Sequence, residues 1–145
     1  MATDETARLT ADVLVLAENH VLLVRRRWDP FADRWALPGG HVDAGEEVTA
    51  AGQRELAEET GVSEVPLDLV GVYSTPGRDP RGRYVTWAFV ALLPERVEPT
   101  AGSDAREVRW WPLAEVLATP HLLAFDHHPI LTDTLAHVRT RALTC

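Results

Sequence analysis

The sequence predicts an α/β fold in which helices cover both faces of a mixed β-sheet. Three observations support this: strand-like segments lie on both sides of a central helical segment, further helical segments end the chain, and no linker or internal repeat divides it. A chain of 145 residues suits one domain with a substantial core. We therefore expect residues 1–145 to form a single domain.

Segments rich in valine and leucine predict the strands, because such side chains pack well in a sheet. The first two strands form a hairpin with Glu18 and Asn19 as its turn, and the third is a short apolar segment before two glycines. In chain order, the predicted strands are residues 9–17, 20–26, 35–38, 67–74, 84–93 and 108–111.

Three helices are predicted. The central one begins at Glu46 or Glu47 and ends at Thr60, with Gly61 in the position of a C-cap glycine. A short helix over residues 113–118 and a longer one over 126–141 complete the chain. Because Asp126 suits an N-cap, we expect His127 and His128 to be helix-start residues rather than metal ligands.

The central helix carries a cluster of carboxylates. Glu55, Glu58 and Glu59 stand at i, i+3 and i+4, which gathers them on one helical face. Each like-charged pair at this spacing costs roughly 0.2–0.5 kcal/mol, so the cluster is unfavourable without a positive partner. Arg54 reaches Glu58, but one guanidinium does not neutralise three carboxylates. A hard divalent cation such as Mg²⁺ or Mn²⁺ therefore suits this face, and points to phosphate chemistry.

The segment before this helix fits the same interpretation. The apolar residues 35–38 run into Gly39 and Gly40, and glycine lets the backbone approach a ligand without a Cβ in the way. A carbonyl oxygen of Gly39 or Gly40 is thus a candidate to complete a metal shell.

Residues 40–62 match the Nudix box, G-x5-E-x7-R-E-U-x-E-E-x-G-U with U aliphatic, at every specified position: Gly40, Glu46, Arg54, Glu55, Leu56, Glu58, Glu59, Gly61 and Val62. The chain resembles the Nudix hydrolases, which implies a Nudix-type α/β/α sandwich. The resemblance also implies that Glu55, Glu58 and Glu59 bind catalytic metal, that Arg54 orients them, and that Glu46 is a further acidic or structural member. A solvated acidic helix is the alternative.

A second segment concentrates positive charge. Residues 73–87 hold Arg78, Arg81 and Arg83 in a Pro/Gly-rich loop of an otherwise acidic chain, and arginines bind diphosphates bidentately. The segment is similar to the region after the box in ADP-ribose pyrophosphatase-like Nudix proteins, although a purely structural loop is the alternative. We predict these arginines, together with Arg27 of the preceding polar loop, as substrate-binding residues.

The resemblance implies a metal-dependent hydrolase of nucleoside diphosphates linked to a moiety X. ADP-ribose or a related dinucleotide is the expected substrate, with AMP and ribose 5-phosphate as products of ADP-ribose. An oxidised deoxynucleoside triphosphate is the alternative substrate. A non-catalytic nucleotide-sensing domain is a third possibility, but such regulators add a basic winged helix, which is not expected after Arg141, and the intact glutamates favour turnover.

The expected mechanism is attack of a metal-activated water on phosphorus, with a carboxylate as the proton acceptor. Glu55 is one candidate. The polar segment 95–107 offers four others, and Glu107 is favoured because it adjoins a predicted strand; the four are Glu95, Glu98, Asp104 and Glu107. Each of these four also fits a solvated acidic loop.

Four aromatic residues are candidates to stack on a base, although most tryptophans in or beside strands belong to the core. They are Trp28, Phe31, Tyr84 and Trp87.

The net charge of −8 argues against non-specific binding to nucleic acid or anionic membrane. No apolar run is long enough to cross a bilayer, and the first ten residues lack the pattern of a signal peptide. The only cysteine is Cys145, so no intrachain disulfide forms. We expect a cytoplasmic protein with a small nucleotide as its partner, and a homodimer is compatible with the sequence.

Overall fold

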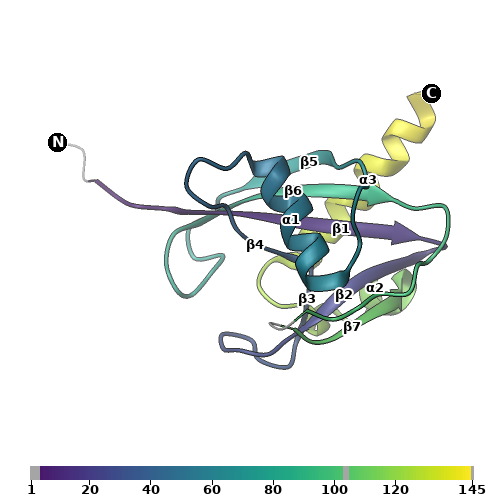
Figure 1. The fold of residues 1–145 in the computed structure, drawn as a ribbon, viewed down its shortest axis with the longest axis horizontal. Coiled ribbons are helices and arrows are strands. Elements are labelled where there is room, and N and C mark those ends of the chain that lie inside the picture. The colour runs from purple at the N-terminus through teal and green to yellow at the C-terminus, as the bar shows by residue number, and fades with distance from the viewer. Residues whose placement is uncertain (1–3, 103–104, 145) are drawn as a thin grey trace.

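The computed structural model describes residues 4–102 and 105–144 (Figure 1). Seven strands, three α-helices and one 3-10 helix follow one another in these residues. In chain order they are β1 Arg8–Ala17, β2 His20–Arg26, β3 Trp35–Ala36, β4 Gly39–His41, α1 Val48–Thr60, β5 Asp68–Tyr73, β6 Tyr84–Leu92, β7 Ala105–Pro112, α2 Leu113–Ala118, η1 Pro120–Leu122 and α3 His127–Thr144.

Strand β1 lies at the centre of one mixed sheet. It pairs in parallel with β6 and antiparallel with β2 and β4, while β5 adds to β6, and both β3 and β7 add to β2. The pairing of β1 with β4 sets Asp12 opposite Gly39 and Ala11 opposite Gly40. The sheet therefore carries the two glycines directly beside the middle of its central strand.

The two faces of the sheet bury separate apolar layers. Alternate residues of a strand point to opposite faces. Accordingly, Val13 and Val15 of β1 pack with Leu56 of α1, whereas Leu14 and Leu16 pack with residues of α2 and α3. Figure 1 shows α1 crossing the sheet in front of β1 and β6, with the yellow helix α3 behind them. The predicted α/β/α sandwich with a mixed sheet is confirmed.

The hairpin turn and the C-cap of α1 have the backbone conformations that the sequence predicts. Glu18 and Asn19 have φ of 49° and 60°, the left-handed conformation that a two-residue hairpin turn of type I′ requires. Gly61 has φ of 78° and donates its N–H to the Ala57 carbonyl, which ends α1 with a left-handed C-cap.

The structure differs from the predicted elements in several places. The strand predicted at 35–38 is shortened to β3, because the Leu37 N–H donates to the His127 ring and Pro38 has no N–H to give a ladder, and the glycines after it form β4, which was not predicted. Strand β7 starts at Ala105, inside the predicted loop, and α3 extends to Thr144. The candidate Asp104 lies outside the described residues. Among the residues described, none of the helices combines the length and apolar character needed to cross a membrane.

Candidate active site

The two glycines of β4 let carboxylates approach the backbone from both sides. A Cβ on Gly40 would lie 2.5 Å from the carboxyl carbon of Glu55, and one on Gly39 would lie 2.3 Å from the Ala11 carbonyl oxygen and 2.4 Å from Asp12 Oδ1. These distances are far below ordinary contact, so any larger residue would displace a carboxylate or the backbone. Glycine at these positions therefore places Glu55 of α1 and Asp12 of β1 on either side of one short strand.

Arg54 joins the acidic residues of this region into one network. Its Nε and Nη2 donate to the two carboxylate oxygens of Glu46 at 2.9 and 3.0 Å, and Nη1 donates to Glu55 at 2.9 Å and to Glu58 at 3.3 Å. Nη2 also donates to the His41 carbonyl at 2.9 Å. One guanidinium thus holds α1, the preceding loop and β4 in fixed relative positions.

The charges of this network are unequally compensated. Hydrogen bonds from Arg54 and from the Asp43 N–H lower the pKa of Glu46 to about 2. By contrast, burial raises the pKa of Glu59 well above its usual range, and the nearby charges of Glu55 and Asp12 raise it further. Glu59 has one favourable backbone contact, the N–H of Gly39. Negative charge therefore remains in excess on the side of α1 that faces β4.

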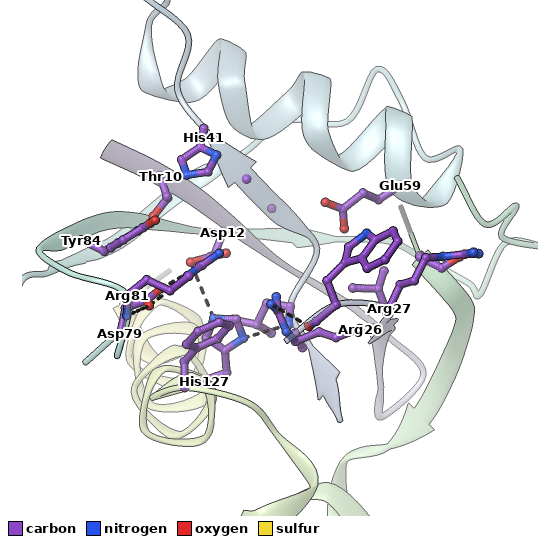
Figure 2. Close-up of a pocket in the computed structure, with 18 of the residues that line it drawn as sticks. Thr10, Asp12, Arg26, Arg27, His41, Glu59, Asp79, Arg81, Tyr84 and His127 are labelled. Carbon is purple, nitrogen blue, oxygen red and sulfur yellow. Dashed lines mark hydrogen bonds and ion pairs between the residues drawn. The ribbon is translucent and has the colours of Figure 1, made fainter. Parts of the chain in front are cut away.

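A cavity of about 400 Å³ opens in front of these carboxylates. Figure 2 shows Glu59 projecting into it from α1, Asp12 on its floor, and Arg26 and Arg27 on another wall. Glu55 and Glu58 do not line it, and the side chain of Glu58 is 59% exposed. The polar residues of the lining are Thr10, Asp12, Arg25, Arg26, Arg27, Asp29, His41, Glu59, Arg78, Asp79, Arg81, Tyr84 and His127.

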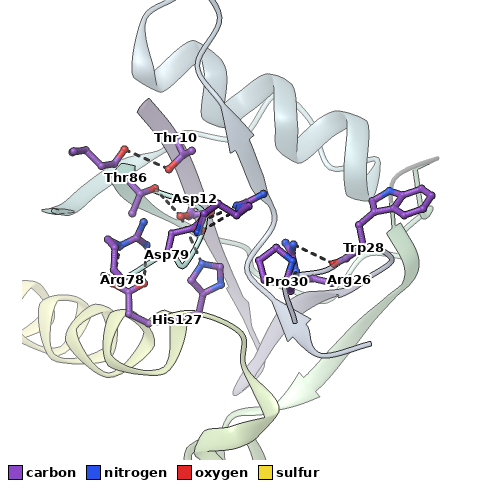
Figure 3. Close-up of polar contacts among 12 residues, drawn as sticks. Thr10, Asp12, Arg26, Trp28, Pro30, Arg78, Asp79, Thr86 and His127 are labelled. Carbon is purple, nitrogen blue, oxygen red and sulfur yellow. Dashed lines mark hydrogen bonds and ion pairs between the residues drawn. The ribbon is translucent and has the colours of Figure 1, made fainter. Parts of the chain in front are cut away.

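A buried polar cluster fixes Asp12 on the cavity floor (Figure 3). Thr86 Oγ1 donates to Asp12 Oδ2 at 2.6 Å, and His127 Nε2 lies 3.8 Å from the same oxygen. The Leu37 N–H donates to His127 Nδ1 at 3.0 Å, so the proton of the neutral ring is on Nε2 and faces Asp12. Burial lowers the pKa of His127, which keeps the ring neutral.

Sequence reasoning missed Asp12 and Thr86, and it assigned His127 only to a helix start. His127 is the first residue of α3, yet it also reaches the cavity. One signal was available: Asp12 is the single charged residue among the apolar residues 11–17 of a predicted central strand. A buried carboxylate is costly unless it is hydrogen-bonded, which makes such a residue a candidate for a site.

Residues 73–87, here called the arginine loop, reach the cavity. The charges of the two arginines that line it are paired with aspartates. Arg78, whose side chain is only 6% exposed, donates from Nη2 and Nε to the two carboxylate oxygens of Asp126 at 2.7 and 2.9 Å. Arg81 makes the same two-pronged contact to Asp79 at 2.7 and 3.0 Å. Both arginines line the cavity. Arg83 does not, and its Nε lies 4.0 Å from Glu5.

Two arginines at the end of β2 differ from those of the loop. Arg26 donates to the carbonyl oxygens of Pro30 and Trp28 at 2.8 and 3.3 Å, and Arg27 donates to the Ala105 carbonyl at 3.5 Å. Within residues 4–102 and 105–144, neither makes an ion pair with a carboxylate. Burial lowers the pKa of Arg26, but an arginine remains charged at neutral pH. The cavity therefore contains cationic groups without anionic partners.

The carboxylates of the predicted loop lie away from the cavity. Glu107 is in β7, where its side chain is 45% exposed and lies 3.8 Å from Arg25 Nη1. Glu95 and Glu98 are exposed, and neither lines the cavity.

The residues at the end of α1 fit a hard divalent cation. Glu59 is buried beside Glu55, and both burial and the charge of Glu55 raise the pKa of Glu59, a repulsion that a bound cation would relieve; Gly40 leaves the room that a Cβ would fill. Carboxylate and carbonyl oxygens are the ligands that Mg²⁺ and Mn²⁺ prefer. In the described part of the chain, no three His, Cys, Asp or Glu side chains already surround one point, since Glu55 and Glu58 bind Arg54.

An acidic helix end and unpaired arginines on separate walls of one cavity define a site for a cation together with an anionic ligand. The comparisons with known proteins agree. The NUDIX domain profile matches residues 6–134. The chain therefore belongs to the Nudix hydrolase family.

Three relatives illustrate the similarity. An ADP-ribose pyrophosphatase of Methanocaldococcus jannaschii is 40% identical over 125 residues, which cover 86% of this chain and 71% of that protein. The NUDIX domain of Shewanella oneidensis NrtR, solved with ADP ribose, aligns with a TM-score of 0.85 at 32% identity over 93% of this chain and 90% of that one. A bifunctional NMN adenylyltransferase/ADP ribose pyrophosphatase of Francisella tularensis, solved with AMP and a manganese ion, aligns with a TM-score of 0.83 at 29% identity over 94% of this chain and 43% of that one.

Proposed function

We propose that this chain hydrolyses the diphosphate of ADP-ribose or a closely related nucleoside diphosphate derivative. The observation that carries the proposal is the cavity in which Glu59 and Asp12 face Arg26 and Arg27. A diphosphate needs both cations and arginines around it, and the site offers both kinds of partner. The 40% identity to an ADP-ribose pyrophosphatase supports the choice of substrate.

Mg²⁺ or Mn²⁺ is the proposed cofactor, and Glu55, Glu58, Glu59 and the Gly40 carbonyl are the proposed ligands. A divalent ion at this point would neutralise phosphate charge and lower the pKa of a bound water. Arg54 keeps Glu55 and Glu58 in position through the hydrogen bonds described above. Glu59 is the carboxylate of α1 that lines the cavity, which supports assigning it to the cation that would bind the reacting phosphate.

The proposed phosphate-binding groups are arginines of the cavity wall. Arg26 and Arg27 are the strongest candidates, because their charges have no carboxylate partner in the described residues. Arg78 and Arg81 remain candidates by position, but each would first have to share its guanidinium with an aspartate. Arg83 would have to move to reach the ligand.

The proton acceptor is proposed from two candidates. Glu55 is 16% exposed and hydrogen-bonded within the acidic network, so a water bound there would lie within its reach. Neither glutamate lines the cavity, but the Glu55 carboxyl lies against Gly40, which does, whereas Glu107 on β7 is placed at Arg25. The geometry therefore favours Glu55.

Two alternatives follow from the same site. An oxidised deoxynucleoside triphosphate also presents phosphates for a cation and arginines. A nucleotide sensor is supported by one observation, the similar NUDIX domain of NrtR that was solved with ADP ribose, because a structure with that ligand shows binding and not turnover. We further propose a small-molecule ligand rather than nucleic acid, on the strength of the net charge of −8, and a cytoplasmic location.

The test is a product assay of the purified protein with Mg²⁺ or Mn²⁺ and a panel containing ADP-ribose, common dNTPs and oxidised dGTP. We expect ADP-ribose to give the highest kcat/KM, with AMP and ribose 5-phosphate as products, and EDTA to abolish turnover. A tenfold preference for oxidised dGTP would select the alternative substrate. Binding of ADP-ribose without any product would select the sensor.

A further inference from the structure

Three aromatic residues line the cavity, and only one of them has an open ring. The ring of Tyr84 is covered by the Arg81 guanidinium at 4.8 Å and faces His41 at 5.9 Å, and Tyr84 is 7% exposed. Phe125 is packed against Phe31 at 4.9 Å and against Arg26 at 4.8 Å. These two rings therefore have no free face for a planar ligand.

Trp28 is the exception. It lines the same cavity, yet 65% of its surface is exposed, which is the largest exposure among the large apolar residues described. A tryptophan face that stays exposed to solvent at the rim of a charged cavity contributes no hydrophobic stabilisation to the fold. Its large ring instead offers a surface on which another planar group can stack.

The backbone around Trp28 is fastened by the neighbouring arginine (Figure 3). Arg26 Nη2 donates to the Trp28 carbonyl at 3.3 Å, and Nε donates to the Pro30 carbonyl at 2.8 Å. The backbone of Arg26 is in turn bonded to Asp33 and Arg34, each at 2.8 Å. A ring on a fixed loop loses little conformational entropy when a ligand binds to it.

We propose that Trp28 is the platform on which the nucleobase of the substrate stacks. This inference rests on the proposed function, because it takes the ligand to be a nucleotide whose phosphate is held by Arg26. Arg26 and Trp28 line the same cavity and are joined by a hydrogen bond from Nη2 to the Trp28 carbonyl, so one short segment offers a phosphate-binding cation and a flat apolar face to the same ligand. Since every base has a π face, such a platform selects nucleotides over sugar phosphates without reading the base edge.

The test measures the contribution of the base to binding, without requiring turnover. AMP and ribose 5-phosphate are titrated by calorimetry, in the presence of Mg²⁺, into the parent, Trp28→Ala and Trp28→Phe. We expect Trp28→Ala to weaken AMP binding by roughly 5- to 150-fold, the range found for loss of one base-stacking aromatic, and to leave the affinity for ribose 5-phosphate unchanged. Trp28→Phe keeps a ring and should retain most of the affinity for AMP.

Two controls accompany these variants. Leu92→Ala removes another exposed apolar side chain, 60% exposed on β6 and outside the cavity lining, and should bind AMP like the parent. Tryptophan emission should be quenched by AMP in the parent and in Trp110→Phe, whose indole instead donates to the Val97 carbonyl, but not in Trp28→Phe.

The outcomes separate this inference from the proposed function. The stacking role is overturned if Trp28→Ala loses AMP and ribose 5-phosphate binding equally or loses neither. It is also overturned if the parent binds no AMP. If the parent hydrolyses ADP-ribose while Trp28→Ala keeps its AMP affinity, only the stacking role fails. If AMP binding depends on Trp28 but no substrate is turned over, the platform stands and the hydrolase proposal fails.

Discussion

Two regions of this molecule are rich in both arginine and carboxylate, and they differ in how the charges are matched. In the network around Arg54, one guanidinium contacts three glutamates, Glu46, Glu55 and Glu58, and Glu59 lies beyond its reach. In the arginine loop, Arg78 and Arg81 each bind one aspartate with two hydrogen bonds. The first region has an excess of negative charge, whereas the pairs of the second are neutral.

We infer that this difference separates residues that bind a ligand from residues that stabilise the fold. A paired guanidinium has to release its carboxylate partner before it binds a phosphate, and the lost pairing reduces the net free energy of phosphate binding. A carboxylate cluster without a positive partner, in contrast, is stabilised directly when it binds a cation. The local matching of charges therefore indicates function better than the local density of charge, and the following four predictions test that distinction.

The largest effect is expected at Glu59. Glu59→Gln should lower kcat by roughly 100-fold or more, because a cation-binding carboxylate contributes several kcal/mol to the transition state. The melting temperature should not fall, since the substitution removes a charge that burial and its neighbours disfavour. Glu115→Gln, an exposed change on α2, is the matched control. Parent-like kcat in Glu59→Gln at saturating metal would remove Glu59 from the catalytic set.

The next effect concerns stability in the arginine loop. Arg78→Ala should lower the free energy of unfolding by about 1.5–3 kcal/mol, because it leaves Asp126 without its charged hydrogen-bond partner. Urea denaturation measures this loss. Asp126→Asn should show a similar loss, and the double variant little more, since both remove one interaction. Unchanged stability together with a raised KM would instead place Arg78 at the substrate, as its position in the sequence suggests.

At Arg27 we expect a smaller effect, and one on substrate binding instead of on stability. Arg27→Ala should raise KM for ADP-ribose about tenfold, the worth of one charge-assisted contact near 1.5 kcal/mol, with little change in stability. Among the described residues, the Arg27 side chain makes a single long hydrogen bond, to the Ala105 carbonyl at 3.5 Å, so the fold depends on it little. Arg139→Ala, an exposed change on α3, serves as the control. A lower melting temperature with unaltered KM would show that Arg27 is structural.

The smallest effect is the pH dependence of the Arg54 network. The pKa of Glu46 is lowered from 4.5 to about 2 in the folded protein, chiefly by hydrogen bonds from Arg54. A depressed folded pKa contributes stability above the unfolded value, and that stability is lost as the pH falls through the folded value. The difference in unfolding free energy between the parent and Glu46→Gln should therefore be constant above about pH 5 and shrink toward pH 2. A difference that grew on acidification would exclude this pairing.

The fold and the local geometry of helix α1 could be predicted because the residues that determine them lie close together in the sequence. Arg54 and its partners Glu55 and Glu58 lie within one helical turn, and Gly61 ends that helix by its own backbone conformation. The site as a whole was less predictable. Asp12 meets Thr86 across 74 positions and Arg78 meets Asp126 across 48, and periodicity carries no information on such pairs.

The same limit applies to the arginine loop. Its positive charge is visible in the sequence, but the start of α3 supplies Asp126, and only the packing of that helix brings the two together. Conversely, the open ring of Trp28 was not distinguishable from the covered ring of Tyr84, because exposure is a property of the folded chain.

The most direct test of the account is a measurement of Mn²⁺ affinity, by calorimetry or electron paramagnetic resonance, for the parent, Glu59→Gln and Arg78→Ala without substrate. If the unmatched carboxylates of α1 form the cation site, the parent should bind Mn²⁺, Glu59→Gln should bind it at least about tenfold more weakly, and folded Arg78→Ala should bind it like the parent. Equal Mn²⁺ affinity in the parent and Glu59→Gln would contradict the central claim.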